Sequence, residues 1–315
     1  MTRLVAVTGA TGFIGQTLVP VLAARGHRLR LLVRSLPPLP PGIGPVELVI
    51  GDLRDPHALR RLVAGADVVV HLAGAIKALN PEAFHRLNAD VVADLAAAMD
   101  GAAPDAHLLL LSSMAAREPH LSPYAASKRA GETALAALPP PRRWTAIRAP
   151  AVYGPGDRET LVFFKAIARG WMASPRGVAG RVSLIHVADL CAAVAATLDR
   201  PPEPGVYEID DGAPGGHTLQ GMAAVAADLL GARVRHVGVP RSVMGALAAT
   251  QQLVARARGQ AAILSAGKVR ELFHPDWTVG DRRLAGWLGF APAFDLKDGF
   301  ADTIGWYRAR GWLKR

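Results

Sequence analysis

Short apolar runs alternate with segments of helical period along the first 150 residues of the chain. The runs are nearly uninterrupted, as in strands that are covered on both faces. Strands are expected over Leu4–Val7, Leu29–Val33, Val46–Ile50, Val68–His71, Leu108–Leu111 and Thr145–Arg148, and a first helix over Phe13–Ala24. A capping residue followed by proline predicts the start of three further helices, at Asp55-Pro56, Asn80-Pro81 and Ser122-Pro123. This alternation predicts an α/β fold built on a doubly wound parallel sheet.

The pattern changes after Pro150, where glycine and proline cluster between the apolar segments. Helices are expected there over Leu219–Leu230, Val243–Arg258 and Leu296–Arg310. We therefore expect a sheet domain over residues 1–165, to which 182–210 returns. Residues 166–315 would form mainly a smaller, mostly helical lobe that binds substrate over the carboxyl ends of the strands. The proline-rich segment Leu36–Pro45 predicts a surface loop.

Composition narrows the class of protein. Half of the residues are apolar, which excludes a disordered chain. The single cysteine, Cys191, excludes an intrachain disulfide and is compatible with a reducing compartment. Because the first strand begins at about residue 3, we expect no leader. No apolar run reaches the roughly 18 to 20 residues of a membrane span. We expect a cytoplasmic protein.

The net charge is +10, with 30 arginines and 6 lysines. The arginines are scattered and do not alternate with aromatic residues, so we expect no nucleic acid partner. Two alternatives would explain the excess of arginine: a coding bias of the genome, or an attraction to anionic lipid or substrate.

A glycine-rich turn with the spacing Gly9-x-x-Gly12-x-x-Gly15 joins the first strand to the first helix. This spacing differs by one residue from the G-x-G-x-x-G fingerprint of dinucleotide sites. Because glycines have no side chain, the backbone N–H groups of this turn can approach a pyrophosphate at the positive end of the helix. We therefore expect a bound dinucleotide here. The expected contacts are Gly9, Thr11, Gly12, Phe13, Ile14 and Gly15.

Three other strand ends contribute to the predicted cofactor site. Arg34, followed by Ser35, ends the second strand, where a basic residue favours the 2′-phosphate of NADP(H) over the free hydroxyl of NAD(H). Asp52, beside Leu53, can accept a hydrogen bond from the adenine amino group. The small residues of Leu72-Ala73-Gly74 leave room for ribose and phosphates. We expect no bound metal.

The candidate reaction centre combines the fifth strand with the helix that follows it. Ser113 ends that strand, Tyr124 opens the helix, and Lys128 lies one turn later on the same face. A tyrosine hydroxyl can protonate a carbonyl that receives a hydride, and a nearby lysine cation lowers the pKa of tyrosine from about 10. Ser113 would hold the substrate oxygen, and Lys128 would also anchor the ribose.

Together these motifs resemble the extended short-chain dehydrogenases/reductases (SDRs) of the NAD-dependent epimerase/dehydratase superfamily. The similarity runs through TGATGFIG at 8–15, GDL at 51–53, HLAG at 71–74, LNAD at 87–90, SS at 112–113, YAASK at 124–128, RAPAVYGPGD at 148–157 and IHVADL at 185–190. The C-terminal phrases at 288–292 and 298–308 are similar to members near 3β-hydroxysteroid dehydrogenases and dihydroflavonol reductases. The resemblance implies that Pro150 and Val152 approach the nicotinamide, and that Asn88 supports the active-site strand.

Departures from the family pattern limit the chemistry. Ser113-Met114-Ala115 stands where dehydratases carry Thr-Asp-Glu, so the acid and base of an elimination are missing. Sugar epimerases favour an acidic residue where this chain has Arg34. The apolar segment Pro240–Leu264, with its spaced arginines, suits an apolar substrate, peripheral contact with the inner membrane surface, or an ordinary amphipathic helix of the lobe core.

We therefore expect an NADP-dependent oxidoreductase that interconverts a ketone and a secondary alcohol on a small, apolar, lipid- or steroid-like substrate. A ceramide-type ketone is one candidate, and the protein would be a monomer or homodimer. A nucleotide-sugar epimerase and a cofactor-holding structural subunit or sensor remain the alternatives. The complete Ser113, Tyr124 and Lys128 set argues against the structural subunit.

Overall fold

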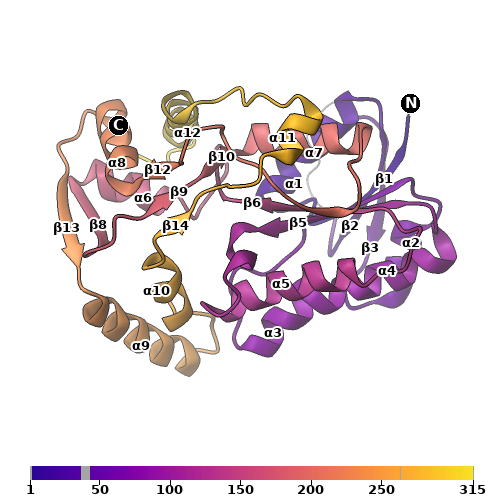
Figure 1. Ribbon diagram of the computed structural model, residues 1–315, viewed down its shortest axis with the longest axis horizontal. Coiled ribbons are helices and arrows are strands. Elements are labelled where there is room, and N and C mark those ends of the chain that lie inside the picture. Colours follow the sequence, from indigo (N-terminus) through magenta and orange to yellow (C-terminus); the bar gives the residue numbers. More distant parts are fainter. Residues whose placement is uncertain (1, 37–42, 263, 315) are drawn as a thin grey trace. The chain divides into compact units, whose positions relative to one another are not determined.

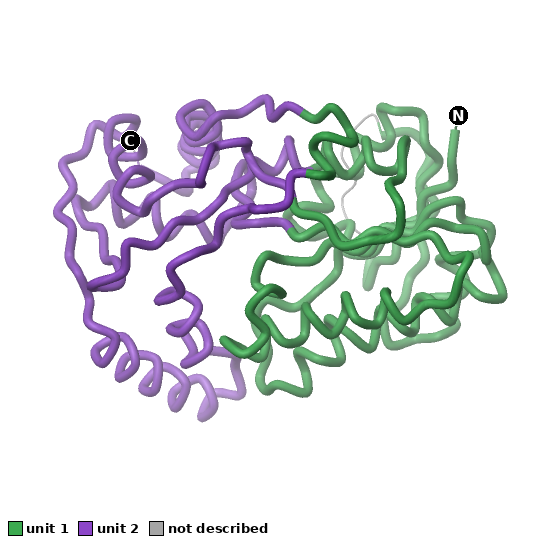
Figure 2. Tube along the Cα trace, in the orientation of Figure 1, with its two compact units in different colours: residues 1–148, 191–208, 283–290 green, residues 149–190, 209–282, 291–315 purple. Residues whose placement is uncertain are grey.

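The computed structural model describes residues 2–36, 43–262 and 264–314. Residues 37–42 of the predicted proline-rich loop and Ile263 of the apolar segment lie outside the described residues. Contacts group the chain into two units (Figure 2). Unit 1 comprises Met1–Arg148, Cys191–Glu208 and Arg283–Phe290, and unit 2 comprises Ala149–Leu190, Ile209–Arg282 and Ala291–Arg315. The domain boundary expected near residue 165 stays a prediction.

A seven-stranded parallel sheet with the order β11-β6-β5-β4-β1-β2-β3 organises unit 1 (Figure 1). Its strands are β1 (Leu4–Thr8), β2 (Arg28–Val33), β3 (Val46–Ile50), β4 (Val68–His71), β5 (His107–Ser113), β6 (Trp144–Ala149) and β11 (Gly205–Glu208). The strand order reverses between β1 and β4, and doubly wound sheets bind ligands at the carboxyl ends of strands beside such a switch point. The predicted fold class is confirmed.

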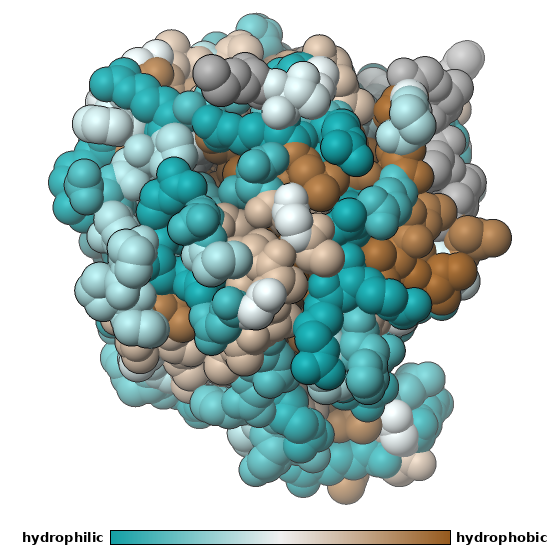
Figure 3. Space-filling view, turned by 90° about the vertical axis from the view of Figure 1, so that its right-hand side faces the viewer, coloured by the Kyte–Doolittle hydropathy of each residue, from teal (hydrophilic) through white to brown (hydrophobic). Residues whose placement is uncertain are grey.

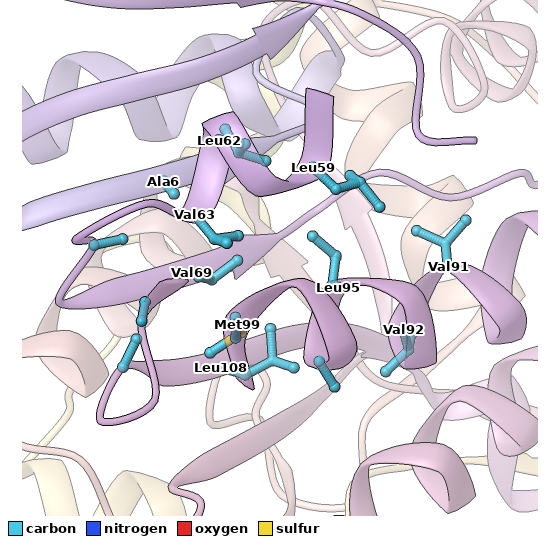
Figure 4. Close-up of a cluster of buried hydrophobic side chains, with 14 of the residues drawn as sticks. Ala6, Leu59, Leu62, Val63, Val69, Val91, Val92, Leu95, Met99 and Leu108 are labelled. Carbon is cyan, nitrogen blue, oxygen red and sulfur yellow. The ribbon is translucent and has the colours of Figure 1, made fainter. Parts of the chain in front are cut away.

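Helices cover both faces of this sheet. They are α1 (Phe13–Ala24), α2 (Pro56–Val63), α4 (Val91–Ala102), α5 (Pro123–Ala136), α7 (Val187–Asp199) and α11 (Arg283–Leu288), and the short α3 (Pro81–His85) packs against α5. In Figure 1, α1 and α7 lie on one face, while α2, α4 and α5 lie on the other. Figure 4 shows the second face, where Leu59 of α2 and Leu95 of α4 meet Val69 of the sheet. Burial on both faces explains why the strands read as continuous apolar runs.

The three predicted helix starts are also confirmed. The side chains of Asp55, Asn80 and Ser122 each accept a hydrogen bond from a backbone N–H in the first turn of the following helix. Such a cap typically stabilises a helix by about 1 kcal/mol. The cap at Ser122 fixes where α5 begins, and this helix carries the predicted catalytic residues.

Unit 2 is built from helices and three small sheets. Its helices are α6 (Leu161–Ala168), α8 (Leu219–Leu230), α9 (Arg241–Ala257), α10 (Ala266–Leu272) and α12 (Leu296–Ala309). Its strands are β7 (Ala151–Tyr153), β8 (Trp171–Pro175), β9 (Arg181–Val182), β10 (Leu184–His186), β12 (His217–Thr218), β13 (Arg235–Val239) and β14 (Asp276–Trp277). Helices α6, α8 and α12 share one core, in which the rings of Phe164 and Phe300 lie 5.0 Å apart.

One face of the molecule, shown in Figure 3, is mainly hydrophilic, with apolar areas between the polar side chains. In the described parts of the chain, no helix is both long enough and apolar enough to span a membrane.

Candidate active site

The glycine-rich turn follows β1 and leaves no room for side chains at two positions. Gly9 has φ +75°, and a Cβ on it would lie 2.6 Å from the backbone nitrogen of Ala73. A Cβ on Gly15 would overlap the carbonyl oxygen of Gly9. Gly12 is the N-cap residue of α1 and has no side chain, so it does not cap the N–H groups of the first helical turn. This arrangement fits a pyrophosphate.

The turn packs directly against the end of β4, where further cofactor contacts are predicted. The N–H of Leu72 donates to the carbonyl of Thr8 over 3.2 Å, and the Thr8 hydroxyl lies 2.7 Å from Nδ1 of His71. Burial lowers the pKa of His71 to about 3, so its ring is neutral near pH 7. The structure therefore brings the predicted phosphate turn and the Leu72-Ala73-Gly74 segment together, with His71 as a buried support.

The predicted ribose and adenine contacts lie after β2 and β3. Arg34 and Ser35 are exposed, and Leu53 packs partly buried against the core. Oδ1 of Asp52 accepts hydrogen bonds of 2.9 Å from both the backbone nitrogen and Nε of Arg54. These bonds hold the pKa of the Asp52 carboxyl below its usual range. The sequence analysis missed this pair, although an aspartate side chain in a turn commonly accepts a hydrogen bond from the backbone N–H two residues later.

The candidate reaction centre lies where α5 packs on β5. Ser113 is the last residue of β5, and its hydroxyl accepts a hydrogen bond of 3.2 Å from the N–H of Ala115. Tyr124 is in the first turn of α5 and meets the ring of Phe84 edge-on at 6.1 Å. Lys128 is buried, and its Nζ donates a 2.7 Å hydrogen bond to the carbonyl of Leu111. The lysine head therefore reaches the strand end that carries Ser113.

Asn88 joins this centre to the cofactor side of the sheet. It lies in a π-helical turn, Arg86–Asp90, between α3 and α4. Its side-chain amide pairs with both backbone groups of Ala75, at 2.8 and 3.0 Å, and its Nδ2 donates to the hydroxyl of Ser127 over 2.9 Å. A Cβ on Gly74 would lie 2.9 Å from Oδ1 of Asn88 and 3.8 Å from Nζ of Lys128. The predicted residues Gly74 and Lys128 are thus neighbours.

The buried carboxylate of Glu132 lies one turn beyond Lys128 on α5, and the sequence reasoning missed it. It accepts hydrogen bonds from Ser112 of β5 and from Arg148 of β6. The sequence could have pointed to Glu132, because it lies four residues after Lys128 and such a spacing puts both side chains on one face of the helix.

Two remaining residues of the predicted cofactor site belong to unit 2. Pro150 directly follows β6, and Val152 lies in β7, where it pairs with Ile185 of β10. Among the described residues, no group of three or more histidine, cysteine, aspartate or glutamate side chains is arranged to hold a metal ion.

A model of the NAD dependent epimerase/dehydratase family matches residues 5–210. The chain belongs to this family. The ceramide reductase of Caulobacter vibrioides is 42% identical over 313 residues, which are 99% of this chain and 96% of that protein. The 4-hydroxy-2-methyl-3-oxo-4-farnesyl-3,4-dihydroquinoline-1-oxide ketoreductase of Stigmatella aurantiaca is 29% identical, over 66% of this chain and 68% of its own.

The solved structure of MoeE5 with UDP-glucuronic acid and NAD superposes with a TM-score of 0.73 over 98% of this chain and 99% of that one. Its identity is 24%, so this likeness supports the fold alone. The family match and the reductase relatives confirm the resemblance to extended SDRs. The chain is an oxidoreductase of this family that acts on a small molecule with a nicotinamide cofactor.

Proposed function

We propose that this SDR reduces a ketone on an apolar, ceramide-like lipid, with Ser113, Tyr124 and Lys128 as its reaction centre. The observation that carries the proposal is the hydrogen bond from buried Lys128 to the carbonyl of Leu111. It brings a cation from the helix of Tyr124 to the strand of Ser113, where a carbonyl reduction needs all three groups.

Each residue has a separate task. When bound, the reduced nicotinamide would supply a hydride to the carbonyl carbon. The hydroxyl of Tyr124 gives its proton to the carbonyl oxygen, which completes a secondary alcohol. The ammonium of Lys128 stabilises the phenolate that remains on Tyr124. The hydroxyl of Ser113 donates to the substrate oxygen and holds it in place.

NADP(H) is our proposed cofactor. The crowded glycine turn and the start of α1 fit its pyrophosphate, as they fit that of NAD(H). Support for the extra phosphate comes from two arginines that follow β2 and β3. Arg34 is exposed, and Arg54 is held by Asp52 beside it. Both present guanidinium groups of the kind that binds phosphate.

An apolar substrate is supported by exposed side chains close to the reaction centre. Ile76 and Leu79 follow Gly74 in the loop that Asn88 holds, and they are 59% and 63% exposed. The similarity to a ceramide reductase over 99% of the chain supports a ceramide-like lipid as the substrate. A lipid ketone would bury these side chains and gain roughly 25 cal/mol for each Å² removed from water.

We further propose that the enzyme works in the cytoplasm, against the anionic surface of the inner membrane. Helix α9 supports this contact, because Ala248 is the residue that it buries while Val243, Leu247, Leu253 and Val254 are exposed. Between Asp228 and Glu271 the sequence has no acidic residue. The basic residues in that stretch are Arg233, Arg235, Arg241, Arg256, Arg258, Lys268 and Arg270. An apolar face among cations suits anionic lipid.

Turnover of purified protein with NADPH tests the proposal. A ketone on a ceramide-like lipid, presented in mixed micelles, should be reduced with one NADPH consumed for each alcohol formed. UDP-glucose should not be epimerised. Epimerisation of the sugar without net cofactor consumption would instead identify an epimerase and overturn the proposal.

A further inference from the structure

A buried carboxylate on α5 has no task in the reaction described above. Glu132 is 3% exposed. Its Oε1 accepts a 2.6 Å hydrogen bond from the hydroxyl of Ser112. Arg148 donates to both carboxylate oxygens, from Nε over 2.9 Å and from Nη2 over 2.7 Å. A carboxylate that is removed from water in this way is stable only because its oxygens are paired.

The position of these contacts links them to the reaction centre. Lys128 and Glu132 are four residues apart and share one face of α5. Lys128 binds the carbonyl of Leu111, and Glu132 binds the hydroxyl of Ser112. Two consecutive residues of β5 are therefore tied to the helix immediately before Ser113. Loss of either tie would let the serine hydroxyl move relative to the helix of Tyr124.

The charges around Glu132 come from four elements. On α5 itself, Arg129 Nε lies 3.8 Å from Oε2 of Glu132. Arg148 of β6 also faces Glu208 of β11 at 3.5 Å, and Glu208 lies 3.9 Å from Arg117 beyond the end of β5. Arg148 therefore keeps an acidic partner if the charge of Glu132 is removed.

Lys128 has fewer charged groups around it than Glu132 has. Burial lowers its pKa to about 8, and the carboxylate of Glu132 opposes this shift. His71 of β4, whose pKa is about 3, carries no charge near neutral pH. Asn88 near the lysine head is neutral as well. Glu132 is thus the negative group that favours the charged lysine.

Building on the proposed function, we infer that Glu132 is a positioning residue of the reaction centre. Its hydrogen bond to Ser112 sets where Ser113 lies relative to α5, and its negative charge keeps the ammonium of Lys128 charged. These two roles are separable, since Ser112→Ala removes the first alone. Glu132→Gln removes the charge and retains an oxygen that can accept from Ser112 and Arg148.

Carbon-13 NMR of protein labelled at the ε carbon of lysine tests the charge role without cofactor or substrate. The chain has six lysines, and the signal missing from Lys128→Met assigns Lys128. We expect the pKa of Lys128 to fall by about one unit in Glu132→Gln. It should not move in Ser112→Ala or in the control Glu47→Gln, which removes an exposed acid that is paired with Arg30 and lies in the edge strand β3. An unchanged pKa in Glu132→Gln would overturn the charge role.

Kinetics test the positioning role. Ser112→Ala should lower kcat about tenfold at every pH, and Glu132→Gln should move the alkaline loss of kcat to lower pH by the shift measured for Lys128. A wild-type kcat in Ser112→Ala would overturn the positioning role. Because Ser112→Ala keeps the buried pair of Glu132 and Arg148, this test remains available even if Glu132→Gln fails to fold. Failure of the proposed function is distinct, since the wild type would then reduce no ketone while the NMR shift would still appear.

Discussion

Lys128 Nζ lies 2.7 Å from the carbonyl oxygen of Leu111, two residues before Ser113. This bond joins the helix that carries Tyr124 to the strand that carries Ser113. It also satisfies one donor of a cation that is almost completely buried, and burial lowers the pKa of Lys128 to about 8. The residue that ties α5 to β5 is therefore also a source of pH dependence, because it is buried.

The first prediction follows from that pKa. Above pH 8 the lysine loses its proton, and the phenolate of Tyr124 loses the cation that stabilises it. We expect kcat for ketone reduction to be level below pH 8 and to fall about tenfold for each unit well above it. Rates at saturating cofactor and substrate measure this. A rate that stays level up to pH 10 would show that Lys128 does not titrate in the working enzyme.

The second prediction concerns the choice of cofactor. Charge-assisted hydrogen bonds from Arg34 to a 2′-phosphate should contribute roughly 1.5–3 kcal/mol, or one to two powers of ten in affinity. We expect NADPH to bind more tightly than NADH by that factor, and Arg34→Ala to remove most of the preference. Arg34→Asp should reverse it. Titrations at fixed salt measure both affinities.

If Arg34→Ala leaves the preference intact, another group binds the ribose phosphate. Arg54 is then the next residue to replace, because Asp52 already holds its guanidinium near the end of β3.

The third prediction tests the apolar substrate. Ile76 and Ile50 are similarly exposed, at 59% and 54%, but Ile76 lies near Gly74 and Ile50 ends the edge strand β3. We expect Ile76→Asn to raise KM for a long-chain ketone about tenfold, while Ile50→Asn leaves it unchanged, because asparagine cannot replace the apolar contact. KM for a short ketone should not change in either variant. An equal effect of the two substitutions would exclude a substrate contact at Ile76.

The fourth prediction tests the membrane contact of α9. Leu253 and Leu36 are matched in exposure, at 71% and 72%, and lie in different units. Wild-type protein and Leu36→Glu should float with vesicles that contain phosphatidylglycerol, and Leu253→Glu should not, because a carboxylate there is repelled by the anionic surface. None should float with pure phosphatidylcholine. Flotation of Leu253→Glu at the wild-type level would exclude α9 as the contact.

Local signals predicted much of this fold. The spacing of apolar residues and the turn residues between them predicted the bounds of β3, β4, α1 and α8. The capping residues predicted where α2, α3 and α5 begin. The apolar run of β5 was expected over Leu108–Leu111, with Ser112 and Ser113 at the tip of the strand, and the structure includes both serines in the strand. Two serines do not look like a buried strand. Ser112 is nevertheless buried, since Glu132 satisfies its hydroxyl.

The candidate site was predictable where neighbours in sequence make it, as in the glycine turn and the Tyr124 to Lys128 spacing. The pairing of Glu132 with Arg148 joins α5 to β6. This contact depends on how the helix packs on the sheet, and no repeating pattern in the sequence predicts that packing. The π-helical turn around Asn88 likewise interrupts a pattern that reads as helix throughout.

The central claim is that the protein transfers a hydride to a ketone while Tyr124 supplies the proton. The most direct test uses NADPH that carries deuterium at the transferred position, a ketone on a ceramide-like lipid, and mass spectrometry of the product. We predict an alcohol that carries one deuterium on the carbinol carbon, formed roughly 100- to 10,000-fold more slowly by Tyr124→Phe, which should still bind NADPH. Unlabelled product, or a Tyr124→Phe enzyme with more than a tenth of the wild-type rate, would contradict the account.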